Sequence, residues 1–177
     1  EGRRTIIIGD HNHDEVVGIA SQVKNATIIS SAEEARSLKK MKRAGVVSQS
    51  TQMIENVNEI LNILSEKIYD LRFVNTICYP TRRNHEQIKK LADTCDLMVV
   101  IGSYTSANSK RLTQLSLARN KNSFQVTCAD ELKKSWFSNI GSVGISAGAS
   151  TPDDLIADVI SKVKIFSKIK VKEEIYE

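Results

Sequence analysis

The chain alternates between short runs of β-branched and apolar residues and longer segments in which apolar positions recur with helical spacing. The short runs predict strands at residues 5–8, 26–29, 45–47, 71–74, 97–101, 124–126 and 143–145. Helices are predicted at residues 31–39, 53–64, 85–92, 109–120 and 152–164, with a short helix from residue 129. Strands that alternate with helices in this way predict parallel sheets covered by helices, so the expected fold class is α/β.

The chain divides into two β/α units of similar size. A polar loop is predicted from Asn75 to Asn84 and separates them, so we expect two consecutive small α/β domains, at residues 1–74 and 75–145. A helical segment follows at 146–166. Beyond Ile165 the pattern gives way to alternating Lys and Glu, which predicts a tail at 167–177.

Composition narrows the function classes. The net charge of the 177 residues is only +4, and the five lysines and three glutamates from Lys162 onward account for half of it. A nucleic-acid-binding domain concentrates more positive charge on one face, so nucleic acid is not an expected partner. Apolar runs such as 97–101 are far shorter than the ~20 residues of a membrane span. No membrane association is therefore expected.

The cysteines suggest a cellular compartment, and the first residue suggests how the chain relates to a longer protein. Three cysteines with irregular spacing argue against a disulfide framework and for a reducing compartment, so we expect a cytoplasmic protein. No leader of a basic, an apolar and a small-residue segment opens the chain, and secretion is not expected. The chain begins with Glu1 and runs at once into a strand, which suggests a piece of a longer protein.

Polar residues gather directly after five of the predicted strands, where ligands bind in open parallel α/β sheets. These segments carry hydroxyls, amides, two of the three histidines and one cysteine, with few Lys or Arg: residues 9–15, 48–51, 76–81, 102–109 and 146–152. Ser, Thr and Asn at such positions commonly cap the following helix. A helix N-terminus beside a hydroxyl also binds anions, so together the five segments favour a phosphorylated small molecule. Neither GxGxxG nor GxxxxGK[ST] occurs.

Individual side chains allow more than one interpretation. His13 and Glu15 are two residues apart, so one could bind an anion while the other moves a proton, or both could belong to a solvated loop. Nothing distinguishes His11. Cys78 lies in a polar stretch, where a thiolate can be a nucleophile or a metal ligand. Cys95 and Cys128 are expected to be small core residues.

The order and content of these segments resemble the 4-hydroxy-3-methylbut-2-enyl diphosphate reductase family, also called LytB. The family's motifs are GHxGHPEVxG, Thr-Gln-Thr-Thr, Ile-Cys-x-x-Thr, Gly-x-x-x-Ser-Ser-Asn and Ala-Gly-Ala-Ser-x-Pro. The matching segments of this chain are, in order, residues 9–18, 48–51, 77–81, 102–108 and 147–152.

The resemblance implies reduction of an allylic hydroxy-diphosphate to isopentenyl and dimethylallyl diphosphates, with a cysteine-bound 4Fe-4S cluster and with ferredoxin or flavodoxin as the electron donor. By position, Cys78 is similar to the last of the family's three cluster cysteines. The resemblance assigns the diphosphate to His13, Ser106, Asn108 and Ser150. It makes Glu15 the proton donor and Ser50 the hydroxyl that assists it. It also implies that 1–74 and 75–145 are the family's second and third domains, and that 146–166 returns to pack on the first. The tail leaves a C-terminal fusion domain possible.

The departures from the family pattern concern the cluster above all. Ala107 replaces a diphosphate-binding serine, and Asp10 stands where a histidine is usual. The family's first two cluster cysteines belong to an N-terminal region, and Cys95 and Cys128 match neither of them. We therefore expect that this chain alone holds no cluster and is inactive. The alternative is a non-redox α/β module that binds diphosphate.

Overall fold

The computed structural model describes residues 2–167, which form two compact units, one through Arg82 and one from Arg83 onward. The elements of the first unit are β1 (Arg4–Ile8), α1 (Asp14–Ser21), β2 (Thr27–Ile29), α2 (Ala32–Ser37), β3 (Met41–Ser48), α3 (Ile54–Lys67) and β4 (Ile68–Val74). The later elements are α4 (Tyr79–Thr94), β5 (Leu97–Ile101), α5 (Ala107–Leu117), β6 (Ser123–Val126), the 3-10 turns η1 (Ala129–Glu131) and η2 (Lys134–Phe137), β7 (Val143–Ala147) and α6 (Asp153–Ser167).

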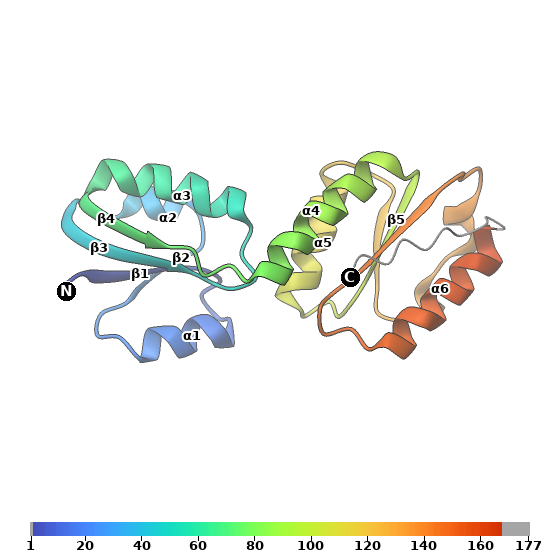
Figure 1. Cartoon of the computed structure of the whole chain (residues 1–177), viewed down its shortest axis with the longest axis horizontal. Helices are drawn as coiled ribbons and strands as arrows, with labels where there is room; N and C mark the ends of the chain where they lie inside the picture. Colours follow the sequence, from blue (N-terminus) through green and yellow to red (C-terminus); the bar gives the residue numbers. More distant parts are fainter. Residues whose placement is uncertain (1, 168–177) are drawn as a thin grey trace. The chain divides into compact units, whose positions relative to one another are not determined.

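The first unit is a parallel sheet in the order β2-β1-β3-β4. Helices α2 and α3 cover one face and α1 lies on the other (Figure 1). Successive residues of a strand point to opposite faces, so Ile6 and Ile8 of β1 join the same core as Val57 and Ile60 of α3. The predicted apolar stripe of α3 therefore supplies the contact that holds this helix on the sheet.

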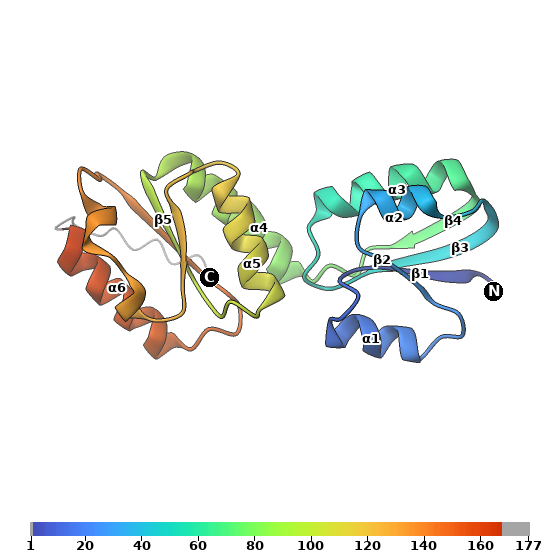
Figure 2. The same cartoon turned by 180° about the vertical axis from the view of Figure 1, so that it is seen from behind.

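The second unit is a smaller parallel sheet in the order β6-β5-β7. Every residue of β5 is buried, because helices cover both faces of the strand (Figure 2). On one face Val99 packs in a cluster with Val159 of α6, and on the other Val100 packs in a cluster with Ile88 of α4 and Leu112 of α5. A strand buried on both faces explains the uninterrupted apolar sequence at 97–101.

The expected α/β class is confirmed: both sheets are parallel, and each is flanked by helices. Two expectations about local structure are wrong. Residues 79–84 are not part of a loop, because α4 begins at Tyr79 with Pro80 in its first turn, a position where proline is tolerated. A helix that the periodicity did not predict, α1, follows the segment with His13. Within residues 2–167 no helix is both long and apolar enough to cross a bilayer.

The segment 146–166 packs, as far as the structure describes it, on the sheet of the second unit. Val159 and Val163 of α6 are buried against the face of β5 that carries Leu97 and Ile101. A return of this segment to a preceding domain stays a prediction. The expected tail at 167–177 lies almost wholly outside the described residues.

Asp96, directly before β5, is hydrogen-bonded to the residues directly before the neighbouring strand β7. One of its carboxylate oxygens accepts hydrogen bonds from the backbone N–H groups of Gly141 and Ser142 at 3.0 and 2.9 Å and from the Ser142 hydroxyl at 3.0 Å. These hydrogen bonds, led by that of the Ser142 hydroxyl, lower the pKa of Asp96 below its usual value.

We predict that Asp96→Asn lowers the melting temperature at neutral pH and that the difference from wild type disappears in acid. A carboxyl whose pKa is lowered by folding contributes stability above its unfolded pKa, near 3.8, and loses that contribution as pH falls through the folded value. Thermal unfolding of both proteins from pH 7 to pH 2.5 is the measurement. Asp93→Asn is the control, because Asp93 pairs with exposed Arg119 and is expected to change stability little. A difference in melting temperature between wild type and Asp96→Asn that stays constant from pH 7 to pH 2.5 would contradict the prediction.

Candidate functional site

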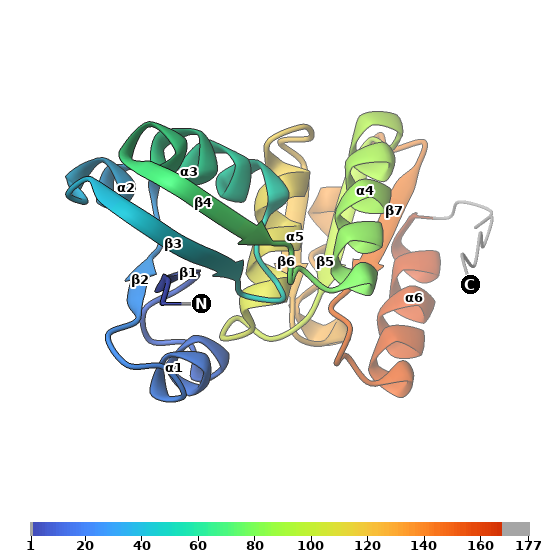
Figure 3. The ribbon, with the colours of Figure 1, turned by 60° about the vertical axis from the view of Figure 1, so that its left-hand side comes forward.

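The carboxyl edge of the first sheet brings three candidate segments to one level. In the parallel register Ile8 lies opposite both Ile29 and Ser48, and Val47 lies opposite Val74. The loops after β1, β3 and β4 therefore leave the sheet at the same edge, toward which the arrowheads of β3 and β4 point in Figure 3. These loops contain His13, Ser50 and Cys78, and Glu15 follows in the first turn of α1.

Glu15 and Ser50 form the best-defined contact at this edge. The backbone N–H of Ser50 donates to Glu15 Oε1 at 2.7 Å, and the Ser50 hydroxyl donates to Glu15 Oε2 at 2.8 Å. Both residues are half-buried. A carboxyl group held through both oxygens has a fixed orientation, so its protonation changes the hydrogen bond with one specific hydroxyl.

His13 caps α1 and is hydrogen-bonded to the backbone of Glu15. Its Nδ1 accepts from the Glu15 N–H at 3.2 Å, and its carbonyl oxygen accepts from Val17 N–H at 3.0 Å. Because Nδ1 is the acceptor, a single ring proton must be on Nε2, which leaves a donor next to the N-terminus of a helix. A ring N–H and free helix amides are both donors for an anion.

Two further residues hold the loop after β1 in place. Buried Gln49 accepts a hydrogen bond from Asp10 N–H at 3.0 Å and donates to Thr51 at 3.0 Å, so it joins the β1 and β3 loops. His11 Nε2 lies 2.9 Å from both carboxylate oxygens of Glu34 on α2. The pKa of Glu34 is lowered first by the backbone N–H of Ser30 and further by His11.

Cys78 lies at the N-terminus of α4 and contacts the loop that carries Ser50. Its N–H donates to the Ser50 carbonyl at 3.0 Å, and its Sγ lies 2.7 Å from Thr81 Oγ1. The thiol is free and exposed. Cys95 and Cys128 are also free and only half-buried, and burial raises the pKa of the Cys95 thiol.

The residues present do not by themselves fit an iron–sulfur cluster. A 4Fe-4S cluster in proteins is held by several cysteine thiolates. Among residues 2–167 no group of three or more His, Cys, Asp or Glu side chains is arranged to hold a metal ion. Cys78 is thus a single candidate ligand, not a complete site.

The other three candidates lie at the carboxyl edge of the second sheet. Ser106 caps α5, where its hydroxyl accepts from Ser109 N–H at 3.3 Å. Asn108 follows in the first turn, and its Oδ1 is buried without a hydrogen-bond partner in the described part of the chain. Ser150 is exposed in the loop after β7. This edge offers hydroxyls, an amide and helix N–H groups, which suit an anion.

Two glycines, which have no side chain, allow close packing at this second edge. A Cβ on Gly102 would lie 2.2 Å from the Ser109 hydroxyl oxygen, and a Cβ on Gly148 would lie 2.6 Å from it. Gly148 N–H and the Thr151 hydroxyl both donate to the Ile101 carbonyl, at 2.9 and 3.2 Å. The start of α5 is therefore in contact with the ends of two neighbouring strands.

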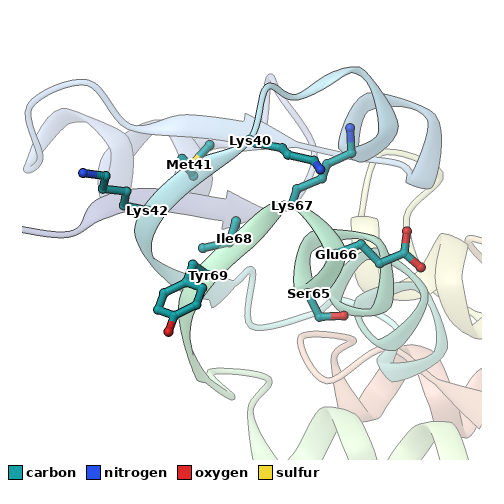
Figure 4. A pocket seen from close by; sticks show the side chains of 8 residues that line it. All are labelled: Lys40, Met41, Lys42, Ser65, Glu66, Lys67, Ile68 and Tyr69. Carbon is teal, nitrogen blue, oxygen red and sulfur yellow. The ribbon is translucent and has the colours of Figure 1, made fainter.

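A hollow of about 580 Å³ lies elsewhere in the first unit, where β3 and β4 begin. Figure 4 shows its lining, which includes Lys40, Lys42, Lys67 and the outward-pointing Tyr69. Lys67 donates to the carbonyls of Arg36 and Leu38 at the end of α2. None of the candidate site residues lines this hollow, so it is separate from the strand edge described above.

Comparison with known proteins decides the family. The family model of the LytB protein matches residues 1–164. The chain is 38% identical over 170 residues to the 4-hydroxy-3-methylbut-2-enyl diphosphate reductase of Geobacter metallireducens, which covers 96% of this chain and 60% of that protein. The chain belongs to the LytB family.

Further relatives and two solved structures are similar to this chain. The LytB chain is 41% identical over 167 residues to the protein of the same name from Campylobacter jejuni, covering 94% of the chain and 60% of the relative. A solved (E)-4-hydroxy-3-methyl-but-2-enyl diphosphate reductase, described as the terminal enzyme of the non-mevalonate pathway, is 34% identical with a TM-score of 0.55, covering 93% of this chain and 60% of that one. The Plasmodium falciparum structure, at 23% identity and a TM-score of 0.85, supports the fold alone and covers 99% of this chain and 59% of that one. The LytB chain thus spans about 60% of the length of these relatives.

Sequence reasoning missed the residues that support the site. Gln49 and Thr81 lie inside the motifs and Ser109 directly follows one, but only the structure shows what they contact. The one available signal for α1 was His13 followed by Asp14 and Glu15, a cap with an acidic first turn. No apolar stripe supports this signal, because Val16 is the only buried residue of α1.

We predict opposite effects for two glycines in the LytB chain. A Cβ on Gly9 would lie 2.6 Å from Val16 Cγ2 and 3.0 Å from two atoms of Gln49, all in a buried region. Gly9→Ala should therefore lower the free energy of unfolding by about 1–3 kcal/mol, the usual cost of overpacking. Urea unfolding followed by circular dichroism measures it.

Gly18→Ala is the matched control, because nothing lies within 4 Å of a Cβ at this exposed helical position. It should raise the free energy of unfolding by about 0.5–1 kcal/mol, since alanine favours a helix interior over glycine. Equal effects of the two substitutions would contradict the close approach of α1 to the end of β1.

Proposed function

We propose that this chain is the diphosphate-binding and proton-donating part of a reductase that converts 4-hydroxy-3-methylbut-2-enyl diphosphate to isopentenyl and dimethylallyl diphosphates. The observation that carries the proposal is the double hydrogen bond of Ser50 to the Glu15 carboxyl group, next to His13 at a helix N-terminus. The names of relatives that are 38% and 41% identical support this substrate.

The reaction that we propose requires a positioned acid. The substrate takes up two electrons and two protons, its C–O bond breaks and its hydroxyl group leaves as water. When Glu15 is protonated on Oε2, its hydrogen bond with the Ser50 hydroxyl reverses: Oε2 donates its proton to Ser50 Oγ, and Ser50 passes its own proton to the leaving hydroxyl. The backbone N–H of Ser50 holds Glu15 Oε1 at 2.7 Å independently of that step. The carboxyl group therefore keeps its orientation during proton transfer.

The diphosphate is bound by neutral donors in this proposal. In the second unit, Ser106, Asn108 and Ser150 supply hydroxyl and amide groups, and the N-terminus of α5 adds backbone N–H groups. His13 of the first unit is proposed as a further donor through its ring. Asn108 would bind the diphosphate through its Nδ2 amide group, because Oδ1 only accepts hydrogen bonds and cannot bind an anion.

The reaction as proposed also requires groups beyond the described residues. A 4Fe-4S cluster would transfer the electrons, with Cys78 as one of its ligands, and ferredoxin or flavodoxin would supply them. The proposal includes a cytoplasmic location, since free thiols persist under reducing conditions.

Glu15→Gln tests the acid in the full-length gene product, reconstituted anaerobically with iron and sulfide. Glutamine can accept the Ser50 N–H hydrogen bond through Oε1 and can donate from Nε2 to the Ser50 hydroxyl, but it is not an acid and cannot give the proton. We expect kcat to fall by about 10²–10⁴, the usual contribution of general acid catalysis, with KM changed little. Ser50→Ala should lower kcat less, because the Ser50 backbone N–H still orients the carboxyl group.

Glu33→Gln is the matched control, because Glu33 is in the first turn of α2 and takes no part in the proposed step. Glu15→Gln with unchanged kcat would reject the acid. A full-length product that binds the diphosphate but never reduces it would favour the alternative of a non-redox diphosphate-binding module.

The 177-residue chain alone is predicted to hold no stable 4Fe-4S cluster, since Cys78 is its single candidate ligand. Anaerobic reconstitution followed by visible absorbance and iron and sulfide analysis tests this. An active cluster on this chain would overturn the prediction, and Cys78→Ser would then show whether that thiol is a ligand.

A further inference from the structure

The loop between β5 and α5 is held by a side chain from the neighbouring strand. Gln125 of β6 donates from Nε2 to the carbonyls of Gly102 and Ser103, at 3.0 and 3.1 Å. Because these carbonyls only accept hydrogen bonds, the NH2 end of the amide must face the loop, and Oε1 lies 3.1 Å from the Thr113 hydroxyl of α5. The beginning of the loop is therefore attached to both β6 and α5.

Tyr104, at the middle of this loop, is attached to the turn after β6. Its hydroxyl lies 3.1 Å from the Gln125 carbonyl and 2.9 Å from Glu131 Oε2. Glu131 also accepts from the backbone N–H and the hydroxyl of Thr127, at 2.7 and 2.9 Å.

The charges of these groups favour the contact. The backbone N–H of Thr127 in particular lowers the pKa of Glu131, while burial first and then Glu131 raise the pKa of Tyr104. Near neutral pH the phenol therefore donates to a carboxylate, a charge-assisted hydrogen bond.

The loop continues directly into the predicted diphosphate residues. Thr105 N–H donates to the Ser103 hydroxyl at 3.2 Å, Ser106 N–H donates to the Ser103 carbonyl at 3.1 Å, and Ser106 then caps α5. A movement at Tyr104 would thus shift the Ser106 hydroxyl and the first turn of α5, which contains Asn108.

We propose that Tyr104 and Gln125 are positioning residues that hold this loop in its anion-binding shape before the ligand arrives. The inference rests on the proposed function and deepens it. Affinity improves when a loop is already ordered in its bound shape, because binding then costs less conformational entropy. Tyr104 is 50% exposed and belongs to none of the three buried apolar clusters. Its hydroxyl is therefore expected to matter more for the loop than for the stability of the unit.

The test uses Tyr104→Phe, which keeps the ring and removes the hydroxyl. In the 177-residue chain we expect the amides of Thr105 and Ser106 to exchange with solvent about tenfold faster, because the loop opens more often. Calorimetric titration with inorganic pyrophosphate should show affinity weakened about three- to tenfold, the range for one lost hydrogen bond. In the full-length reductase KM should rise by the same factor with kcat unchanged.

Tyr69→Phe is the matched control, because Tyr69 is 97% exposed at the hollow in the first unit. It should change none of these quantities. Unchanged exchange and affinity in Tyr104→Phe would overturn the proposal. A melting temperature that falls together with affinity would also overturn it, since Tyr104 would then support the whole unit. If the wild-type chain binds no pyrophosphate, the proposed diphosphate site and the binding role of Tyr104 are both rejected, whereas exchange still decides whether Tyr104 holds the loop.

Discussion

The candidate proton donor depends on the parallel pairing of β1 with β3. This pairing sets Ile8 opposite Ser48, so the loops after both strands leave the sheet at one level although they are about forty residues apart in sequence. Close contact between these loops requires a residue without a side chain at Gly9, where Val16 and Gln49 fill the space. Gln49 then joins the two loops, and Ser50, the next residue, reaches Glu15 with both its N–H and its hydroxyl. A change in the register of β1 against β3 would separate donor and acceptor, so the strand pairing determines which side chains meet at this edge.

In the second sheet, too, the strands bring polar groups together at their carboxyl ends. Its central strand β5 is buried on both faces and cannot carry polar groups, so they are confined to its carboxyl end. There Gly102 and Gly148 leave room for Ser109, and the N-terminus of α5 comes close to two strand ends. The resulting surface has hydroxyl, amide and backbone donors and few cations. Neutral donors give direction without the strong hydration of an ammonium group, which suits the proposed diphosphate site.

Much of this arrangement can be predicted from sequence, and the failures have physical causes. Strand β5 has the predicted bounds, because a strand that is buried on both faces is apolar throughout. Helix α3 is predicted as directly, because its apolar stripe is the face that packs on the sheet. Helix α1 escaped detection because it buries one residue, and the start of α4 escaped because Tyr79 and its neighbours are exposed, although Pro80 was an available signal. The candidate residues at strand ends follow from the rule that parallel strands share an edge. The roles of Gln49 and Gln125 do not follow from any local pattern, because each contacts a loop that only strand pairing brings near.

The same reasoning explains why a metal cluster is the part of the proposed function that the described residues support least. Proton transfer requires two side chains in contact, which neighbouring loops of one sheet supply. Anion binding requires hydrogen-bond donors, several of which the loop after β5 and the first turn of α5 supply together. A 4Fe-4S cluster requires several thiolates at fixed separations, and the described residues offer Cys78 alone at the first edge, while Cys95 and Cys128 are half-buried elsewhere. Local folding is therefore sufficient to arrange the proposed acid and the proposed anion donors, whereas the proposed cluster would need thiolates in addition to Cys78.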